Sequence, residues 1–314
     1  MKIFDALLHH PPSPLQSVEH EAFSQRGLLL LVKRDDLLHP HVSGNKWRKL
    51  KHNLLEARRL GLTRLVTFGG AYSNHLAAVA AAGMEFGFST LGVVSGEEKI
   101  VVNPTLGFAK ECGMDLRFTS RANLRNLSET ELLQLLKIEP TGTFILPQGG
   151  ANCLALPGCR EIVAETEAQL GHPPDFFITA CGTGATLAGI VSGLTGQSQA
   201  LGISVLKGDF LQKEVEKLLA ACGEKPNTTW QILDDFHFGG YAKFTPELID
   251  FINDFKQKTG IPLDPIYTGK AMFATCELAK QGFFPEGASL VFVHTGGIQG
   301  IAGFNQRFNN QIAT

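Results

Sequence analysis

The sequence contains few tyrosines and no excess of charge of either sign. Only 3 of its 314 residues are tyrosine, and 28 basic side chains balance 30 acidic ones to give a net charge of -2. No long basic block occurs. This balance argues against nucleic acid or an anionic membrane surface as the main partner.

Long hydrophobic runs are also missing. The longest obvious apolar run, Leu28 to Val32, is far too short to cross a bilayer. Residues 1–18 contain Asp5, two histidines and three prolines, which is typical of neither a signal peptide nor a membrane span. These absences predict a cytoplasmic protein without a membrane partner.

The six cysteines form no C-x-x-C pair and no regular framework. We therefore expect reduced thiols, mostly packed in the interior, in preference to disulfides or metal ligands. The pair His39 and His41 has no carboxylate and histidine set nearby. No metal site is predicted.

Short apolar runs alternate with longer amphipathic segments along the whole chain, a pattern that predicts an α/β fold in which helices cover a mostly parallel sheet. The length is sufficient for two domains. The strands are predicted at Arg64–Phe68, Thr90–Val94, Thr143–Leu146, Asp175–Ala180, Ile203–Leu206 and Ser289–His294. The helices are predicted at Lys49–Leu60, Asn74–Ala82, Glu129–Ile138, Arg160–Leu170, Thr186–Leu194 and Leu211–Ala221.

One lysine, Lys46, stands where a glycine-containing turn meets a predicted helix, in the run Ser43 to Leu50. Burial favours the neutral form of an amine, and a neutral amine can bond covalently to an aldehyde cofactor. Lys49 follows three residues later and shares a helix face with Lys46. The alternative is a basic first turn of a solvated surface helix.

A second candidate site is the loop from Gly182 through Thr183, Gly184 and Ala185 to Thr186, which connects a buried strand to an apolar helix. Such a loop directs backbone N–H groups and the positive end of the helix dipole at an anion, so it fits a phosphate. Because a side chain would block this approach, we expect substitution of Gly184 to weaken phosphate binding more than folding. The loop matches neither a Walker loop nor a dinucleotide fingerprint, and a tight structural turn is the alternative.

Three further groups of polar residues carry two interpretations each. Ser73 and Asn74 open a helix, so they are either N-caps or anion ligands, and His75 is either a polar helix residue or a substrate contact. The tyrosines at 72, 241 and 267 all lie in glycine-rich or motif segments, where they are core residues or acid–base groups. Thr295 follows an apolar strand, where it is either part of a structural turn or a hydroxyl that contacts a cofactor.

Five segments in the same order resemble the family of 1-aminocyclopropane-1-carboxylate deaminase and D-cysteine desulfhydrase. They are Lys33–Leu37 with Ser43–Leu50, Ser73–His75, Cys181–Thr186, Asp264–Lys270 and His294–Gly297. The resemblance spans nearly the whole chain and implies a tryptophan synthase beta-like fold that uses pyridoxal 5'-phosphate. It also implies a homodimer, with a large domain formed by residues 1–47 and 157–314 and a small domain formed by residues 48–156.

The resemblance implies a role for each candidate residue. Lys46 would hold the cofactor, while Lys49 and residues 182–186 would hold its phosphate. Asn74 would bond the phenolic oxygen of the ring, Thr295 would meet the ring nitrogen, and Ser73, Asn74 and His75 would line the substrate. Tyr267 would stand over the reactive carbon, with Tyr241 helping to set its protonation.

The residue after Tyr267 separates the branches of this family. Deaminases that open the cyclopropane ring carry the pattern Tyr-Glu-Gly-Lys, whereas this chain has Tyr267-Thr268-Gly269-Lys270. The threonine resembles the desulfhydrase branch and predicts a lyase or deaminase that converts D-cysteine, or a related β-substituted D-amino acid, to pyruvate, ammonia and sulfide. The alternatives are cyclopropane ring opening, a β-replacement synthase and a catalytically silent relative that only binds a ligand.

Overall fold

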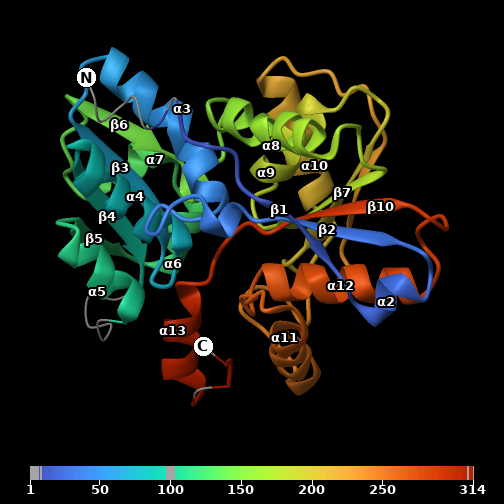
Figure 1. Cartoon of the computed structure of the whole chain (residues 1–314). Coiled ribbons are helices and arrows are strands. Elements are labelled where there is room, and N and C mark those ends of the chain that lie inside the picture. The colour runs from blue at the N-terminus through green and yellow to red at the C-terminus, as the bar shows by residue number, and fades with distance from the viewer. Residues whose placement is uncertain (1–6, 8, 97–102, 310, 314) are drawn as a thin grey trace.

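The computed structural model describes residues 7, 9–96, 103–309 and 311–313. They form two separate sheets, each with helices packed against it (Figure 1). The six-stranded sheet has the order β1-β2-β10-β7-β8-β9, and only the β1–β2 pair is antiparallel. The four-stranded sheet has the order β5-β4-β3-β6 and is entirely parallel.

The six-stranded sheet consists of β1 (Leu15–Val18), β2 (Leu29–Lys33), β7 (Phe176–Cys181), β8 (Gln199–Ser204), β9 (Trp230–Leu233) and β10 (Ser289–Val293). Around it lie α2 (Glu21–Ser24), η1 (Asp35–Leu37), α8 (Ala155–Leu170), α9 (Ala185–Gly193), α10 (Leu211–Ala221), α11 (Pro246–Thr259) and α12 (Thr268–Lys280). The four-stranded sheet consists of β3 (Arg64–Gly70), β4 (Ser89–Ser95), β5 (Asp115–Thr119) and β6 (Thr143–Leu146). Its neighbours are α3 (Asn45–Arg59), α4 (Asn74–Phe86), α5 (Pro104–Glu111), α6 (Arg121–Asn126), α7 (Glu129–Leu135), η2 (Gln148–Gly150) and, packed on α5, α13 (Gly300–Phe308).

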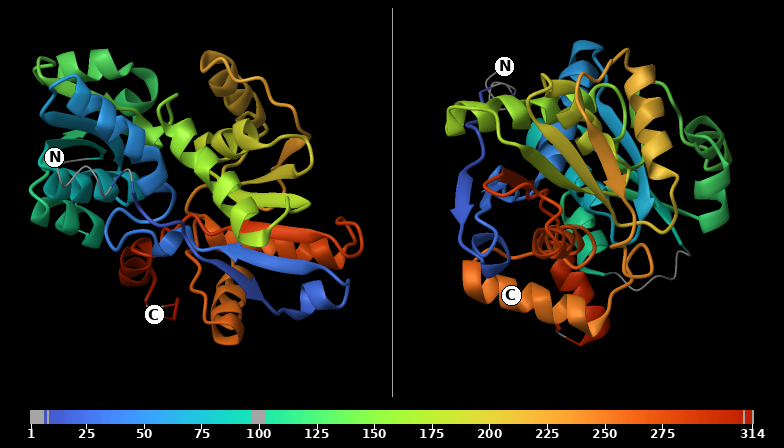
Figure 2. Two further views of the ribbon diagram at one scale, coloured as in Figure 1. Left: turned by 45° about the horizontal axis from the view of Figure 1, so that its top comes forward. Right: turned by 90° about the vertical axis from the view of Figure 1, so that its right-hand side faces the viewer.

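Helices cover both faces of the large sheet, so both faces are buried. Because successive side chains of a strand point to opposite faces, each strand contributes to both cores. In β10, Leu290 and Phe292 join the core formed with α2, α11 and α12, whereas Val291 and Val293 join the core formed with α8 and α9. Figure 2 shows these two helical layers on opposite sides of the strands. Continuous apolar strands therefore occur here because neither face meets solvent.

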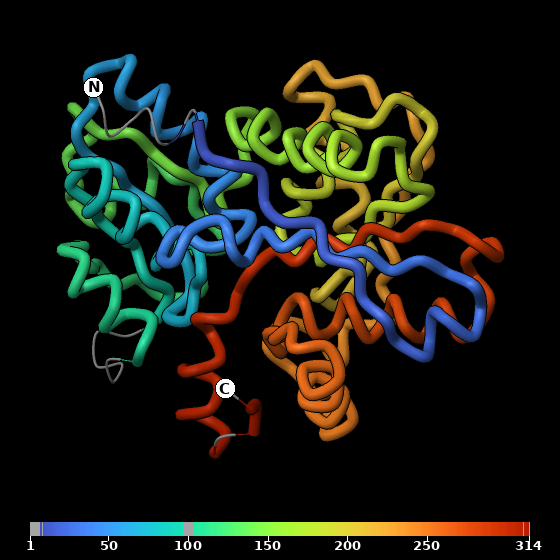
Figure 3. The backbone as a smooth tube through the Cα atoms, in the orientation of Figure 1, coloured from blue at the N-terminus to red at the C-terminus, as the bar shows by residue number. Residues whose placement is uncertain are grey.

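The chain passes between the two halves more than once. Segments far apart in the sequence meet at the centre, where β2 pairs in parallel with β10 (Figure 3). The start of α3 and the segment from β6 to α8 lie at this junction. The division into domains of residues 1–47 with 157–314 and residues 48–156 stays a prediction.

All six predicted strands and all six predicted helices are present, but some bounds were wrong. The strand predicted at Ile203–Leu206 is β8, which ends at Ser204 because the Ser204 hydroxyl bonds both the N–H and the carbonyl of Leu206 and turns the chain. Helix α8 begins at Ala155, five residues before the predicted Arg160, because Pro157 is tolerated in a first turn. Among the described residues, no helix combines the length and apolar character needed to span a membrane.

The prediction that the cysteines are reduced was wrong for two of the six. Cys153 and Cys222 form a disulfide, with their Cα atoms 5.3 Å apart, although 69 positions separate them in the sequence. The turn before α8 and the end of α10 meet only in the folded chain, so spacing along the sequence does not reveal the pair. Cys112, Cys159, Cys181 and Cys276 are free and buried, as predicted.

Candidate active site

The turn before α3 is held against the loop that follows β10. Gly44 has φ of 64°, and a Cβ at this position would lie 2.0 Å from the carbonyl oxygen of Thr295. The N–H of Asn45 donates to that same oxygen at 3.1 Å. Only glycine permits this contact, which fixes the start of α3 and hence the position of Lys46.

The amines of Lys46 and Lys49 converge on one acceptor. Both Nζ atoms lie 3.4 Å from the carbonyl oxygen of Gly149 in η2. Burial lowers the pKa of Lys46 well below its ordinary value, and the charge of Lys49 lowers it further. Burial also lowers the pKa of Lys49. The neutral amine that covalent capture of an aldehyde requires is therefore favoured at Lys46.

The loop between β7 and α9 lies beside these lysines. Asn45, the residue before Lys46, donates from Nδ2 to the Thr186 hydroxyl at 2.8 Å. A Cβ on Gly149 would lie 2.7 Å from the Thr183 side chain, so η2 also touches the loop. The first N–H groups of α9 have no partner within the helix and are available to an anion. Residues 182–186 and the two lysines thus share one site.

The reason given above for Gly184 was wrong. This residue has φ of 77°, and a Cβ here would lie 2.2 Å from Cγ2 of Val215 in α10. The position therefore faces a neighbouring helix, and its glycine is required for packing and backbone conformation. Gly182 is the loop glycine that faces the site, since a Cβ there would lie 3.0 Å from the ring of Tyr267.

Residues 73–75 begin α4 and point in different directions. The Ser73 hydroxyl accepts the N–H of Leu76 at 3.3 Å and caps the helix. The Asn74 side chain lies against the loop after β10: its Oδ1 accepts a hydrogen bond from Gln299 at 3.0 Å, and its Nδ2 would lie 3.3 Å from a Cβ on Gly297. His75 is 2 % exposed and lies behind Gly150.

His75 is a buried histidine with unsatisfied ring nitrogens. Neither nitrogen makes a well-directed hydrogen bond to the protein, although the backbone of Pro147 lies close by. Burial lowers its pKa well below the ordinary value, and the charges of Lys46 and Lys49 lower it further. The neutral form of His75 is therefore favoured.

Tyr267 is positioned by a buried carboxylate that the sequence did not single out as a site residue. Asp264 is 2 % exposed and accepts the N–H groups of Ile266, Tyr267 and Thr268 at 2.8 to 3.0 Å. The Tyr267 and Tyr241 rings meet edge to face at 6.2 Å. Burial, and next Tyr241, raise the pKa of Tyr267 well above its ordinary value, so its phenol stays protonated.

Lys270, which completes the motif that begins at Asp264, supports Tyr241. Its amine donates to the carbonyl of His237 at 2.9 Å and to the carbonyl of Gly240, the residue before Tyr241, at 2.8 Å. Burial lowers the pKa of Lys270 to about 8. Tyr241 itself is 49 % exposed, so it lies at the mouth of the site.

Two threonines of the motifs have different surroundings. The Thr268 side chain is fully buried, and its hydroxyl donates to Asp264 Oδ1 at 2.8 Å and accepts the Asp264 N–H at 2.9 Å. The Thr295 hydroxyl makes no hydrogen bond to any described residue, although Thr295 is only 7 % exposed. Thr268 is therefore committed to the protein, whereas Thr295 is available to a ligand.

Three charged residues of the first motif, Lys33, Asp35 and Arg48, are structural. Arg48 lies between two carboxylates, with bidentate bonds of 2.7 Å to Asp35 and of 2.8 and 2.9 Å to Glu165. Lys33 completes the network through Glu165 at 2.8 Å. Lys33, Asp35 and Arg48 are buried. These side chains fix α3 on α8 and leave the chemistry to Lys46 and Lys49.

Residues 6–296 match the family model described as "Pyridoxal-phosphate dependent enzyme". The chain belongs to this family. It therefore uses pyridoxal 5'-phosphate, as predicted, and its relatives are enzymes that depend on this cofactor.

Several relatives carry names that are more specific than the family description. A protein of Pyrococcus furiosus, provisionally named 1-aminocyclopropane-1-carboxylate deaminase, is 34 % identical over 287 residues, or 87 % of this chain and 86 % of that protein. A mitochondrial protein of Arabidopsis thaliana, named bifunctional D-cysteine desulfhydrase/1-aminocyclopropane-1-carboxylate deaminase, is 29 % identical and covers 94 % of this chain and 78 % of its own. A crystal structure of an "ACC deaminase homologue" aligns over 99 % of both chains with a TM-score of 0.82 and 29 % identity. The predicted tryptophan synthase beta-like fold is confirmed.

The residues of the site fit pyridoxal phosphate. Lys46 offers an amine whose neutral form is favoured, and the N-terminus of α9 with Lys49 offers donors to a phosphate. Thr295 and His75 offer polar atoms that have no hydrogen-bond partner among the described residues. Sequence reasoning missed Asn45, Asp264 and the Gly149 carbonyl. Asp264 stands in a segment that was quoted only for the resemblance, Gly149 lies outside the segments singled out above, and Asn45 gave no signal beyond its place beside Lys46.

Proposed function

We propose that the protein is a lyase that eliminates the β-substituent of D-cysteine, or of a related β-substituted D-amino acid, and releases pyruvate, ammonia and the leaving group. The observation that carries this proposal is Thr268. Because residue 268 is a threonine, this position supplies no carboxylate beside Tyr267. The threonine hydroxyl bonds Asp264 instead. The ring-opening branch of the family has a glutamate there. The name of the Arabidopsis thaliana relative supports D-cysteine as a substrate of this family.

In this proposal the amine of Lys46 would hold the cofactor. Lys49 and residues 182–186 would hold its phosphate, and Asn74 and the Thr295 hydroxyl would hold its ring. When bound, pyridoxal phosphate supplies the electron sink for removal of the α-proton. A hydroxyl at Thr295, unlike a carboxylate, would not favour protonation of the ring nitrogen.

We assign proton transfer to Lys46 and Tyr267. The lowered pKa of Lys46 suits its Nζ for taking the α-proton, and the raised pKa of Tyr267 keeps on its hydroxyl the proton that would go to the departing sulfur. Tyr241 helps to keep Tyr267 protonated. The N-terminus of α4, with Ser73 and Asn74, receives the substrate carboxylate, and His75 supports this wall of the site.

The second candidate function is deamination of 1-aminocyclopropane-1-carboxylate, which the names of the relatives from Pyrococcus furiosus and Arabidopsis thaliana support equally. A β-replacement synthase and a silent ligand-binding relative remain as alternatives, since they would keep Lys46 and the same fold. We also propose a homodimer by family resemblance.

The deciding experiment measures release of keto acid from D-cysteine, L-cysteine and the cyclopropane compound by cofactor-loaded protein. We expect release of pyruvate from D-cysteine and no release of any keto acid from the cyclopropane compound. Turnover of the cyclopropane compound alone would instead establish the second candidate. Assays with an added thiol identify a synthase through a new thioether product, and Lys46→Ala is the inactive control.

A further inference from the structure

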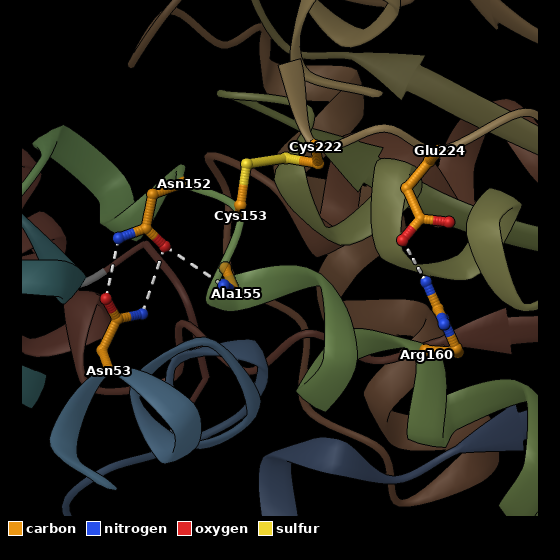
Figure 4. Close-up of a disulfide and its surroundings, with 7 residues drawn as sticks. All are labelled: Asn53, Asn152, Cys153, Ala155, Arg160, Cys222 and Glu224. Carbon is orange, nitrogen blue, oxygen red and sulfur yellow. Dashed lines mark hydrogen bonds and ion pairs between the residues drawn. A yellow bond between two sulfur atoms is a disulfide. The ribbon is translucent and has the colours of Figure 1, made fainter. Parts of the chain in front are cut away.

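The Cys153–Cys222 disulfide joins α10 to the segment of residues 148–153, which lies against the cofactor lysines. Cys222 is the C-cap residue of α10, whereas Cys153 stands in the turn before α8 (Figure 4). Gly149, at the start of the same segment, presents its carbonyl to Lys46 and Lys49. The disulfide therefore ties down one end of a segment whose other end touches both amines.

The connection from Cys153 to α3 runs through a pair of asparagines. Asn152 and Asn53 exchange side-chain hydrogen bonds of 2.7 and 3.2 Å, and Asn152 also accepts the N–H of Ala155 at 3.1 Å (Figure 4). Asn53 is fully buried and donates to the backbone carbonyl of Lys49 at 2.7 Å. An unbroken series of contacts thus leads from the disulfide to Lys49.

Among the six cysteines, only Cys153 and Cys222 are accessible to an external thiol. Cys153 is exposed and Cys222 is half-buried. The other four cysteines are buried, and burial raises the pKa of Cys159 to about 11 and that of Cys181 to about 12. Thiolates attack disulfides at accessible sulfur atoms, so an external thiol meets only the Cys153–Cys222 bond.

We propose that Cys153–Cys222 is a thiol–disulfide exchange site, and that its reduction weakens cofactor binding by releasing residues 148–153 from α10. A thiolate of a small dithiol attacks the Cys153 sulfur and expels the Cys222 thiolate, which takes up a proton. The second thiol of the reagent then displaces Cys153 and closes the reagent's own disulfide. The dithiol loses two electrons and two protons, and the protein gains two thiols.

The contacts around Cys222 keep the effect local. Arg160 of α8 pairs with Glu224, two residues beyond Cys222 (Figure 4). Arg160 also bonds the Ser192 hydroxyl at 3.2 Å. The buried Val215 and Leu219, which share a core with α8 and α9, hold α10 in place after reduction, with this ion pair at its end. The segment that gains freedom is therefore the one that carries Asn152 and Gly149. The inference rests on the cofactor site proposed above but not on the identity of the substrate.

The first test counts thiols and measures cofactor affinity. Protein purified in air without reductant and then unfolded should react with four equivalents of maleimide, and with six after reduction. Apo protein reduced with a water-soluble phosphine and freed of it should bind pyridoxal phosphate at least about fivefold more weakly than the oxidised form, the lower end of ordinary couplings between sites. Amide hydrogen exchange of residues 148–153 should become faster.

Variants separate this effect from a purely structural crosslink. The double substitution Cys153→Ser with Cys222→Ser should reproduce the affinity of the reduced form and no longer respond to the phosphine, whereas Cys112→Ser should behave like the original protein. If the double variant does not fold, reduced wild-type protein decides the question. Six reactive thiols before reduction, or a lower stability with unchanged cofactor affinity, would overturn the proposal. Neither result depends on turnover of any substrate.

Discussion

At the scale of single residues, burial acts in opposite directions on the pKa values of one amine and one phenol. Burial lowers the pKa of Lys46 and raises that of Tyr267, so both groups are favoured in their neutral forms. The same physical cause therefore produces an acceptor at one position and a donor at the other. Lys49, at the same carbonyl as Lys46, is left to meet an anion.

Borohydride reduction of the cofactor-loaded protein should fix pyridoxal phosphate irreversibly on Lys46, because its amine is buried, its neutral form is favoured and the residue before it contacts Thr186. Peptide mapping by mass spectrometry locates the label. Lys46→Ala should abolish it, while Lys49→Ala should weaken cofactor binding without moving the label. A label on Lys49 or Lys270 would refute the assignment.

Tyr267→Phe should lower the rate of elimination by roughly 100- to 10,000-fold, the usual contribution of a positioned acid–base group. The visible absorbance of bound cofactor should persist, since the phenol is not expected to hold the cofactor. The measurement pairs initial rates with an absorbance spectrum. Loss of the cofactor together with activity would make Tyr267 a binding residue instead.

At the scale of elements, the loop between β7 and α9 depends on a third element, α10. Gly184 faces Val215 of α10, whereas Gly182 faces Tyr267. Two glycines of one loop are thus required for different reasons, one for packing within the large sheet's helical layer and one for space in the site.

Gly184→Ala should destabilise the apo protein by roughly 2 kcal/mol or more, because it combines a positive φ with overpacking against Val215. Gly171→Ala is the matched control: its φ is 84°, but a Cβ there meets nothing within 4 Å, so only the conformational cost of about 1 kcal/mol applies. Urea denaturation measures both. Equal losses of stability would show that the contact with Val215 is relieved at no cost.

At the scale of the whole molecule, a buried ionic network joins distant parts of the chain. Lys33, Asp35, Arg48 and Glu165 lie on β2, η1, α3 and α8. Burial alone would raise the pKa of Glu165, but its bonds to Arg48 and Lys33 prevail and lower it. The network fixes the helix that carries Lys46.

Asp35→Asn should cost roughly 3 to 5 kcal/mol of unfolding free energy, because it leaves the buried charge of Arg48 incompletely paired. Glu56→Gln, which breaks the exposed pair with Arg59, should change nothing measurable. Since the pKa of Glu165 is lowered on folding, its contribution to stability is complete above its unfolded pKa and is lost as the pH falls through the folded value. Denaturation curves from neutral to acid pH should show a smaller loss of unfolding free energy in Glu165→Gln than in the original protein.

The sequence by itself determined the α/β class, six of the strands and six of the helices, and the motif segments that carry Lys46, Lys49, residues 182–186 and Tyr267. The strands β1, β2, β5 and β9 and the helices α2, α5, α6, α11, α12 and α13 were not predicted. Periodicity and glycine placement are local properties, so they are readable without the fold. Only the tertiary structure decided what depends on distant segments meeting: that Asp264 positions Tyr267, that Gly184 faces α10, that Lys33, Asp35 and Arg48 are structural, and that Cys153 reaches Cys222. A side chain's direction and its degree of burial, which set these contacts and the pKa shifts, arise when the chain closes on itself.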